Sequence, residues 1–434
     1  MTVPPLTDPE RSERPPLGPR RRFRPGARSL LRNRDFVRLW TAETVSQVGS
    51  QVTLLAIPLL AITTLKATTF QVGALNAVEF APFLIVGLPA GVIVDRRRRR
   101  PVLMFGDLGR AIALFSIPLA WWLGWLTLGQ LFVVVFTTGV LTVFFDVAYQ
   151  SYLPALVDSD QLGEGNAKLQ MSDSGAQVVG PGLAGSLVQI VGAPTSVLVD
   201  AISFLLSAGS VSRIQRAEPP VDAPPKHEQP SMRSQIGEGL RYLLGHPVLK
   251  CVAGCTATSN YFSSMTQAVL LVYFVRVLHY SAGVIGLVLM LASIGFFVGA
   301  AVESRVERVL KLGRTIWLSI VVSEAGAFFV AFSPRHHAFG WIIAGLLLTS
   351  LGSPIYNIAQ VSYRQAITPN NMLGRMNASM RFMVWGTMPL GSLTGGLLGT
   401  LFGLKTTLII GAFGGVLAVF FVLTKAVREL VTVA

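Results

Sequence analysis

Long apolar segments recur along almost the whole chain, and they constrain its fold more than any other feature. A membrane-crossing helix needs about 20 mainly apolar residues, and on that scale the sequence holds about twelve spans. Only 13% of the residues are charged, about half the share typical of soluble domains. We therefore expect an all-α membrane protein with twelve transmembrane helices. The predicted spans are 37–64, 70–94, 102–124, 129–150, 165–190, 194–214, 248–278, 283–302, 314–333, 338–358, 373–399 and 404–425.

Polar segments divide these spans into two groups of six. The longest polar gap, 215–247, holds a Pro-rich linker followed by a short amphipathic helix that we expect to lie on the membrane surface. The predicted organisation is a disordered basic tail at 1–36, six-helix halves at 37–214 and 248–425, and a second tail at 426–434.

Basic residues gather on one side of this topology. If the N-terminal tail is cytoplasmic, only Lys66, Arg276, Arg335 and Lys405 of the 36 Lys and Arg residues fall at or near the outer ends. This asymmetry follows the positive-inside rule, so we expect both tails and the run 96–100 in the cytoplasm. A net charge of +14 can also indicate nucleic-acid binding, but basic residues interleaved with long apolar spans argue against that partner.

Motifs that carry enzyme chemistry are missing from the sequence. The five histidines form no metal-ligand pattern. No phosphate-binding loop, nucleophile elbow or dinucleotide fingerprint occurs in a strand–turn–helix context. Cys251 and Cys255 lie four residues apart in an apolar span, which indicates packing. We therefore expect no enzyme activity, no cofactor and no metal site.

An internal repeat relates the two halves. A shift of 211 positions aligns residues 151–185 with ten identities in 35, among them Gly185 with Gly396. Because each half has an even number of spans, both halves keep the same orientation in the membrane. Parallel repeats of this kind are typical of transporters whose substrate site lies between the repeats near the midplane.

The loop between spans 2 and 3 resembles the signature of the major facilitator superfamily. That signature has Gly, three residues, Asp, a basic residue, then Gly and two more basic residues. Arg98 replaces the family's second glycine here. The matching residues are Gly91, Asp95, Arg96, Arg99 and Arg100.

Longer phrases are similar to the bacterial branch that contains the enterobactin and macrolide exporters. They include "FDVAYQSYLPALVDSDQLGEGNAKLQ" and "VLVDAISFLLSA". The resemblance covers nearly the whole chain from about residue 30. It implies a multi-pass, monomeric transporter in the inner (cell) membrane of a bacterium.

The resemblance also implies roles for two motifs. In this family the signature Asp and its basic partners latch the cytoplasmic side. Here Asp95 would accept hydrogen bonds from the start of span 11, and Asp146 would join the gate by pairing with Arg96 or Arg99. This latch is expected to form when the protein opens outward and to break when it opens inward. In span 5, "GAQVVGPGLAG" resembles the antiporter motif of the family, although a simple packing kink is an open alternative. The residues of that motif are Gly175, Gly180, Pro181 and Gly185.

Polar residues about four apart form stripes on the spans that line the cavity in this superfamily, the first and fourth of each half. Polar side chains are costly against lipid and normally face a protein interior or a wet cavity. Hydrogen bonds that merely hold the bundle together are the alternative for any single residue. The predicted substrate-binding residues are Glu43, Gln47, Gln51, Thr138, Thr142, Asn260, Gln267, Tyr356, Asn357 and Gln360.

Carboxyl groups inside the spans are candidates for proton coupling, because a buried carboxyl group can hold a proton near the working pH. Glu79 in span 2 and Glu324 in span 9 lie nearest mid-depth, and Asp200 in span 6 is a third candidate. Asp107 and Arg110, three residues apart in span 3, are expected to pair with each other.

These features predict a proton-coupled exporter of small hydrophobic or amphipathic compounds, such as drugs or siderophores. The expected partners are a small-molecule substrate, protons and membrane lipids. An importer or lipid translocator of the same fold, a sodium-coupled carrier, and a membrane sensor that transports nothing are the alternatives.

Overall fold

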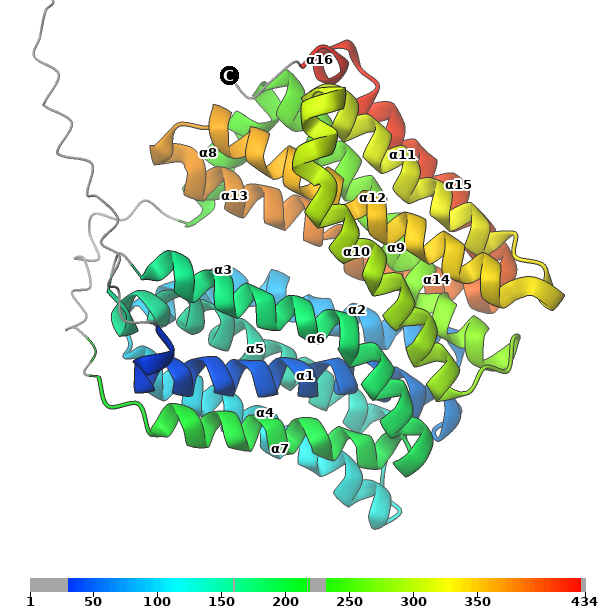
Figure 1. Ribbon diagram of the computed structural model, residues 1–434. Helices are drawn as coiled ribbons and strands as arrows, with labels where there is room; N and C mark the ends of the chain where they lie inside the picture. Colours follow the sequence, from blue (N-terminus) through cyan, green and yellow to red (C-terminus); the bar gives the residue numbers. More distant parts are fainter. Residues whose placement is uncertain (1–29, 159–160, 217, 219–231, 431–434) are drawn as a thin grey trace, which may run out of the picture.

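The computed structural model describes residues 30–158, 161–216, 218 and 232–430, and every regular element in them is a helix (Figure 1). The N-terminal half contains α1 (Arg34–Thr63), α2 (Thr69–Ile85), α3 (Gly87–Asp95), α4 (Arg99–Trp122), α5 (Leu128–Leu156), α6 (Leu162–Val191) and α7 (Ala193–Ser212). The C-terminal half contains α9 (Pro247–Arg276), α10 (Ala282–Leu310), α11 (Leu312–Ala331), α12 (Ala338–Ile367), α13 (Asn370–Trp385), α14 (Thr387–Leu401) and α15 (Leu404–Val422). Helix α8 (Met232–Gly245) lies between the halves in sequence, α16 (Lys425–Arg428) follows α15, and short 3-10 helices cover Leu30–Arg32 and Arg335–His337.

The long helices of the described chain form twelve membrane-spanning units, six in each half. Helices α2 and α3 together make one interrupted unit, and α13 and α14 make another. Eight described helices are each long and apolar enough to cross a membrane, while α6 and α9, of 30 residues each, contain more polar residues. The predicted all-α fold with twelve transmembrane helices in two halves is confirmed.

Helix ends differ from the predicted spans. The first helix begins at Arg34, and Leu30 and Phe36 are fully buried, so the structured chain starts before the predicted end of the tail at residue 36. Residues 1–29 of that tail lie outside the described residues. Three helices continue about two turns past the predicted spans, because a helix need not stop where the hydrocarbon ends. These helices are α5, α10 and α12.

Proline and glycine explain the two interruptions. Pro82 and Pro89 lie on either side of Val86, where α2 ends and α3 begins. Each proline removes a backbone hydrogen bond and clashes with the preceding turn. Gly386 separates α13 from α14, and Pro389 follows three residues later.

The two halves pack together at one end of the molecule and separate at the other. We call the end that holds α8 and α16 the linker end, and the opposite end, with Gly192 and Gly403, the far end (Figure 1). One hydrophobic core at the far end contains residues of both halves. At the linker end each half has a core of its own. The halves therefore diverge toward the linker end.

Two helix crossings close the far end. Helix α6 meets α10 where Gly185 faces Gly286, and α2 meets α14 where Gly73 faces Gly396. A Cβ atom at Gly185, Gly286 or Gly73 would overlap the facing backbone, so glycine is what permits this close approach. Since Gly185 and Gly396 are partners in the internal repeat, the repeat also relates the two crossings.

Candidate functional site

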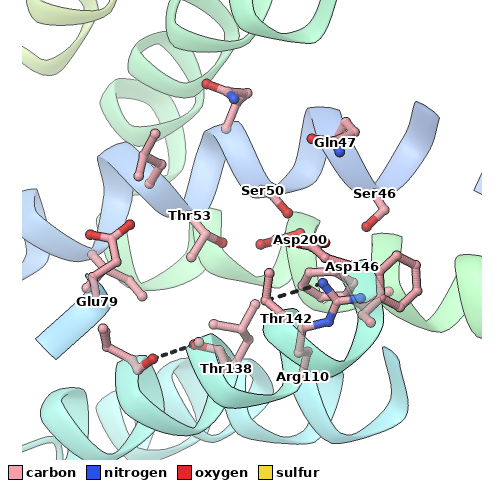
Figure 2. A pocket seen from close by; sticks show the side chains of 18 of the residues that line it. Ser46, Gln47, Ser50, Thr53, Glu79, Arg110, Thr138, Thr142, Asp146 and Asp200 are labelled. Carbon is pink, nitrogen blue, oxygen red and sulfur yellow. Dashed lines mark hydrogen bonds between the residues drawn. The ribbon is translucent and has the colours of Figure 1, made fainter. Parts of the chain in front are cut away.

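An acidic cavity of about 340 Å³ lies inside the N-terminal half, among α1, α2, α4, α5 and α7 (Figure 2). Four carboxyl side chains line it, one from each of four helices. They are Glu43 of α1, Glu79 of α2, Asp146 of α5 and Asp200 of α7. Serine and threonine hydroxyls of α1 and α5 surround them in Figure 2.

Hydrogen bonds satisfy these carboxyl groups only in part. Oε1 of Glu43 accepts a hydrogen bond from Nε2 of Gln47 at 2.7 Å, whereas its Oε2 is buried with no partner. Oδ1 of Asp200 accepts from Oγ of Ser203 at 3.0 Å. Among the described residues, no hydrogen bond reaches the carboxyl group of Glu79 or of Asp146.

Arg110 of α4 is the basic residue of this cavity, and its neighbours hold it in place. Nη2 of Arg110 donates to Oδ1 of Asp107 at 2.6 Å, and the other oxygen of Asp107 accepts from Oγ of Ser207 at 2.6 Å. The guanidinium carbon lies 4.3 Å from the ring centroid of Phe145 and 4.1 Å from that of Phe204, within cation–π range. The predicted pair is confirmed. Among the described residues, none of the four lining carboxyl groups forms an ion pair of its own, and Arg110, the one basic side chain of this wall, pairs with Asp107.

A second cavity, of about 530 Å³, lies in the C-terminal half among α9, α11, α12, α13 and α14. Its charged lining residues are Arg364 and Arg381, and neither forms an ion pair with a described residue. Nε of Arg364, Oε1 of Gln360 and Oδ1 of Asn377 are buried there without a partner. This cavity is therefore basic and rich in amide groups.

A cleft of about 430 Å³ between the halves adjoins both cavities. It shares Asp146 with the acidic cavity, and it shares Asn377, Arg381 and Trp385 with the basic cavity. The rings of Phe83 and Trp385, which both line the cleft, meet edge to face with centroids 5.5 Å apart. The two broken units, α2–α3 and α13–α14, thus touch at the cleft.

Nine of the ten predicted substrate-binding residues line one of the two cavities. Gln267 does not, because the basic cavity follows α9 only as far as Asn260, and the Gln267 side chain is exposed elsewhere. Substrate contact itself stays a prediction. The acidic cavity receives Glu43, Gln47, Gln51, Thr138 and Thr142. The basic cavity receives Asn260, Tyr356, Asn357 and Gln360.

The three carboxyl groups predicted to couple protons lie in different surroundings. Glu79 and Asp200 line the acidic cavity. Glu324 of α11 does not line the basic cavity, and its Oε1 accepts a hydrogen bond from Oγ of Ser259 at 2.6 Å. Ser259 does line that cavity, so Glu324 is one side chain removed from it.

The predicted gate is not assembled in this conformation. Asp146 lines the acidic cavity and the cleft, and no ion pair joins it to Arg96 or Arg99 in the described chain. That pair is expected only when the halves close at the cytoplasmic end, and here they separate at the linker end, so the pair stays a prediction. Asp146 lies ten residues before the end of α5, about 15 Å inside the helix, whereas the arginines follow the end of α3. Gly91 lies inside α3, and Asp95 ends it, with a side chain outside the described residues.

Glu218, at the start of the linker, binds the arginine run instead. The backbone N–H groups of Arg99 and Arg100 donate to its carboxylate at 2.6 and 2.8 Å, and the Arg100 side chain donates to the carbonyl oxygen of Ser212. A carboxylate at the first turn of α4 satisfies free N–H groups and suits the helix dipole. The side chains of Arg96–Arg98 are exposed.

The residues of the predicted antiporter motif face other helices. A Cβ atom at Gly180 would overlap the side chain of Gln51 on α1, and one at Gly185 would overlap the backbone of α10. Gly175 has open space in front of it, and Pro181 lies inside α6. The motif therefore supplies close helix contacts, and its role in antiport stays a prediction.

Sequence reasoning missed the two arginines of the basic cavity. Arg381 lies inside a predicted span, where an ionisable residue normally faces a cavity or the protein interior, so that rule could have found it. Arg364 lies beyond the predicted span, because α12 continues to Ile367. An arginine outside the apolar run gives no signal of a cavity inside the membrane.

Comparison with known protein families identifies the family to which this chain belongs. The family model of the Major Facilitator Superfamily matches residues 39–386, which is most of the described chain. The chain belongs to this superfamily. It is a multi-pass membrane transporter of the bacterial type.

Several relatives within the superfamily are efflux proteins. The chain is 26% identical over 380 residues to the multidrug efflux pump Tap of Mycolicibacterium fortuitum, covering 85% of this chain and 90% of the relative. It is 25% identical over 359 residues to the enterobactin exporter EntS of Citrobacter koseri, covering 80% and 82%. It is 22% identical over 180 residues to macrolide efflux protein A of Streptococcus pyogenes, covering 42% and 44%. The predicted resemblance to the exporter branch is confirmed.

Solved structures agree with the fold. A bacterial homologue of the iron transporter ferroportin in its inward-facing state superposes with a TM-score of 0.71 at 16% identity, covering 91% of this chain and 98% of that one. At this identity the likeness concerns the fold alone.

Proposed function

We propose that this member of the major facilitator superfamily is a secondary active exporter of small hydrophobic or amphipathic compounds, driven by exchange with protons. The linker end faces the cytoplasm in this proposal, because the basic residues gather there. The halves separate at that end and close at the far end, so this conformation accepts substrate from the cytoplasm. Release follows when the cleft closes at the linker end and opens at the far end.

The acidic cavity is the observation that carries the proposal. Its volume of about 340 Å³ falls in the range that holds drug-sized ligands. Leucine, isoleucine and phenylalanine side chains supply most of the apolar lining, including Leu54, Leu75 and Phe83. A wall of this kind suits a substrate with an apolar body.

The excess of carboxyl groups over basic groups in this cavity is the reason to propose that it binds protons. Four carboxyl groups line the cavity beside a single basic side chain, Arg110, which already pairs with Asp107, and an unpaired charge inside a membrane is costly. Before substrate binds, the cavity can reduce that cost by holding protons, and a bound substrate would displace them. Competition of protons and substrate for the same carboxyl groups produces exchange, which is the requirement for antiport.

Proteoliposomes loaded with a pH-sensitive dye test the proposal. With the far end exposed to the more acidic side, Hoechst 33342 should move toward that side while protons move the other way, and a protonophore that collapses the proton gradient should abolish the driven movement of Hoechst 33342. Glu79→Gln and Asp200→Asn should uncouple the two fluxes. Glu238→Gln, which alters only an ion pair at the linker end, is the matched control.

Three outcomes would reject parts of this function. Transport that needs sodium and survives a protonophore would show that sodium, and not the proton, is the coupling ion. Transport in the opposite direction would indicate an importer. A broad panel of compounds that moves no protons would favour a sensor that transports nothing.

A further inference from the structure

The two cavities are lined by opposite kinds of ionisable group, carboxyl groups in one and guanidinium groups in the other. In the N-terminal half, four carboxyl groups line the wall after Asp107 has neutralised Arg110. In the C-terminal half, Arg364 and Arg381 line the wall without an ion-pair partner among the described residues. The nearby Glu324 is hydrogen-bonded to Ser259 behind that wall. Each half therefore offers an uncompensated charge to the space between them.

Buried polar atoms without partners occur in both walls. The Glu43 side chain is only 8% exposed, and its Oε2 has no hydrogen bond. The Gln360 side chain is 3% exposed, and its Oε1 also has none. Leaving a buried polar group unsatisfied is energetically costly. An amide that rotates can offer either its oxygen or its N–H groups, so Gln360 can serve a ligand of either sign.

The cleft brings the opposite charges to one space. Asp146 of α5 lines both the acidic cavity and the cleft, and Arg381 of α13 lines both the basic cavity and the cleft. The guanidinium of Arg381 lies over the ring of Trp385, 5.5 Å from its centroid, which gives the basic side an aromatic surface as well. A ligand in the cleft thus meets a carboxyl group on one side and a guanidinium on the other.

We infer that the substrate is a zwitterionic amphiphile, with a cationic group bound by the carboxyl groups around Asp146 and an anionic group bound by Arg364 and Arg381. This inference rests on the transport function proposed above and names the class of compound that the site selects. A purely cationic ligand leaves both arginines unpaired, and a purely anionic ligand faces four carboxyl groups. A ligand with both charges satisfies both walls at once.

The same arrangement gives the ligand a means of driving closure. A ligand can shift a conformational equilibrium only by its difference in affinity for the two states. Because the two charges lie on different halves, a bipolar ligand binds both of them best when the halves approach at the linker end. A ligand with a single charge binds one half and has less to gain from that movement.

Three dansyl probes that differ mainly in charge test the inference on the purified full chain in lipid nanodiscs. They are ε-dansyl-lysine (zwitterion), dansylcadaverine (cation) and dansylglycine (anion), titrated by fluorescence near neutral pH without a proton gradient. We expect the zwitterion to bind about tenfold or more tightly than either singly charged probe. Equal binding of the zwitterion and the cation, or no binding of the zwitterion, would overturn the inference.

Substitutions of the arginines test which side chains bind the anionic group of the ligand. Arg381→Gln and Arg364→Gln should remove the advantage of the zwitterion and leave dansylcadaverine binding within about twofold. Arg381→Lys keeps the charge and should retain part of the preference. Arg375→Gln is the control, because Arg375 lies on the same helix but pairs with Glu238 and lines neither cavity nor cleft. Equal weakening of all three probes by Arg381→Gln, at an unchanged unfolding midpoint, would contradict the assignment.

The binding assay and the transport assay test the two proposals separately, so either proposal can be rejected while the other is upheld. A preference for the zwitterion without proton-driven flux would uphold the site and reject the exporter. Proton-driven flux of cations, with no preference for the zwitterion in binding, would uphold the exporter and reject the bipolar substrate. If Arg381→Gln lowers the unfolding midpoint, Arg364→Gln and Arg381→Lys decide the assignment.

Discussion

At the scale of single residues, the Arg110–Asp107 pair shows how this protein keeps charge inside a membrane. The Arg110 and Asp107 side chains are 5% and 0% exposed, so neither charge reaches solvent. Two aromatic rings, the hydroxyls of Ser207 and Thr142 and the carbonyl oxygen of Gly106 also contact the pair. Such a pair is stable as a unit, although each member alone would be costly.

This arrangement predicts non-additive effects of mutation. Arg110→Met leaves the Asp107 carboxyl group buried without its partner and should cost about 3–5 kcal/mol in stability. The double variant Arg110→Met/Asp107→Leu should recover much of that loss, because replacing a buried ion pair by apolar residues is often neutral. Thermal unfolding midpoints of the single and double variants in detergent measure both effects. Additive losses in the double variant would show that the two residues act separately.

Residue types alone predicted one wall of the site better than the other. Stripes of polar residues on α1 and α5 were visible because helical periodicity aligns residues four apart. The charge difference between the halves was not visible, because Arg364 lies beyond the span that composition suggests. Which polar side chains meet across the cleft depends on how the halves are tilted, and no local pattern encodes that tilt.

At the scale of helices, apolar length and proline position determine different features. Composition predicted all twelve membrane-spanning units, since each needs an apolar run of fixed length. It did not predict the interruptions at Val86 and Gly386, because a proline or glycine inside an apolar run leaves the run as apolar and as long as before. It also missed the cap on α4, because Glu218 lies about 120 residues away from that helix in sequence and long-range pairing cannot be read from local pattern.

The start of α9 makes helix stability depend on pH. Nδ1 of His246 accepts hydrogen bonds from the N–H groups of Val248 and Leu249 at 3.3 and 3.4 Å, which requires a neutral ring. Burial lowers the pKa of His246 below its usual value of 6.5. The unfolded chain therefore binds more protons between the lowered pKa and 6.5, and stability falls as the pH drops below about 6.5.

A substitution separates this effect from other titrations. His246→Asn keeps a side chain that accepts hydrogen bonds at a helix start but removes the titrating group. The variant should lose part of the decline in unfolding midpoint between about pH 7 and pH 5. His279→Asn is the control, because His279 lies in a turn at the far end and caps no helix of the described chain. An identical pH profile in the wild type and His246→Asn would exclude His246 as the cause.

At the scale of the whole molecule, close contacts at glycine residues hold the two halves together at the far end. The core at the far end is continuous across the halves, and the cores at the linker end are separate. In the transport cycle proposed above, the outward-open state must therefore separate α6 from α10 and α2 from α14. The sequence repeat predicted that the halves correspond, but the conformation follows from contacts between the halves.

Side chains at the glycine crossings should shift this equilibrium. Gly185→Leu inserts a side chain into the backbone of α10, so it destabilises the closed far end and leaves the linker-end surfaces unchanged. Gly175→Leu is the matched control, since it lies on the same helix and in the same motif but faces open space. Spin labels are placed at Lys66 and His279, one in each half at the far end, after both native cysteines are replaced. Double electron–electron resonance then measures the distance between the two labels. We expect longer distances for Gly185→Leu and unchanged distances for Gly175→Leu. A preference of about 1.4 kcal/mol for the open state would change the populations tenfold, which such distance distributions resolve. If both variants gave the wild-type distribution, the crossing would tolerate the side chain and glycine would not control the far end.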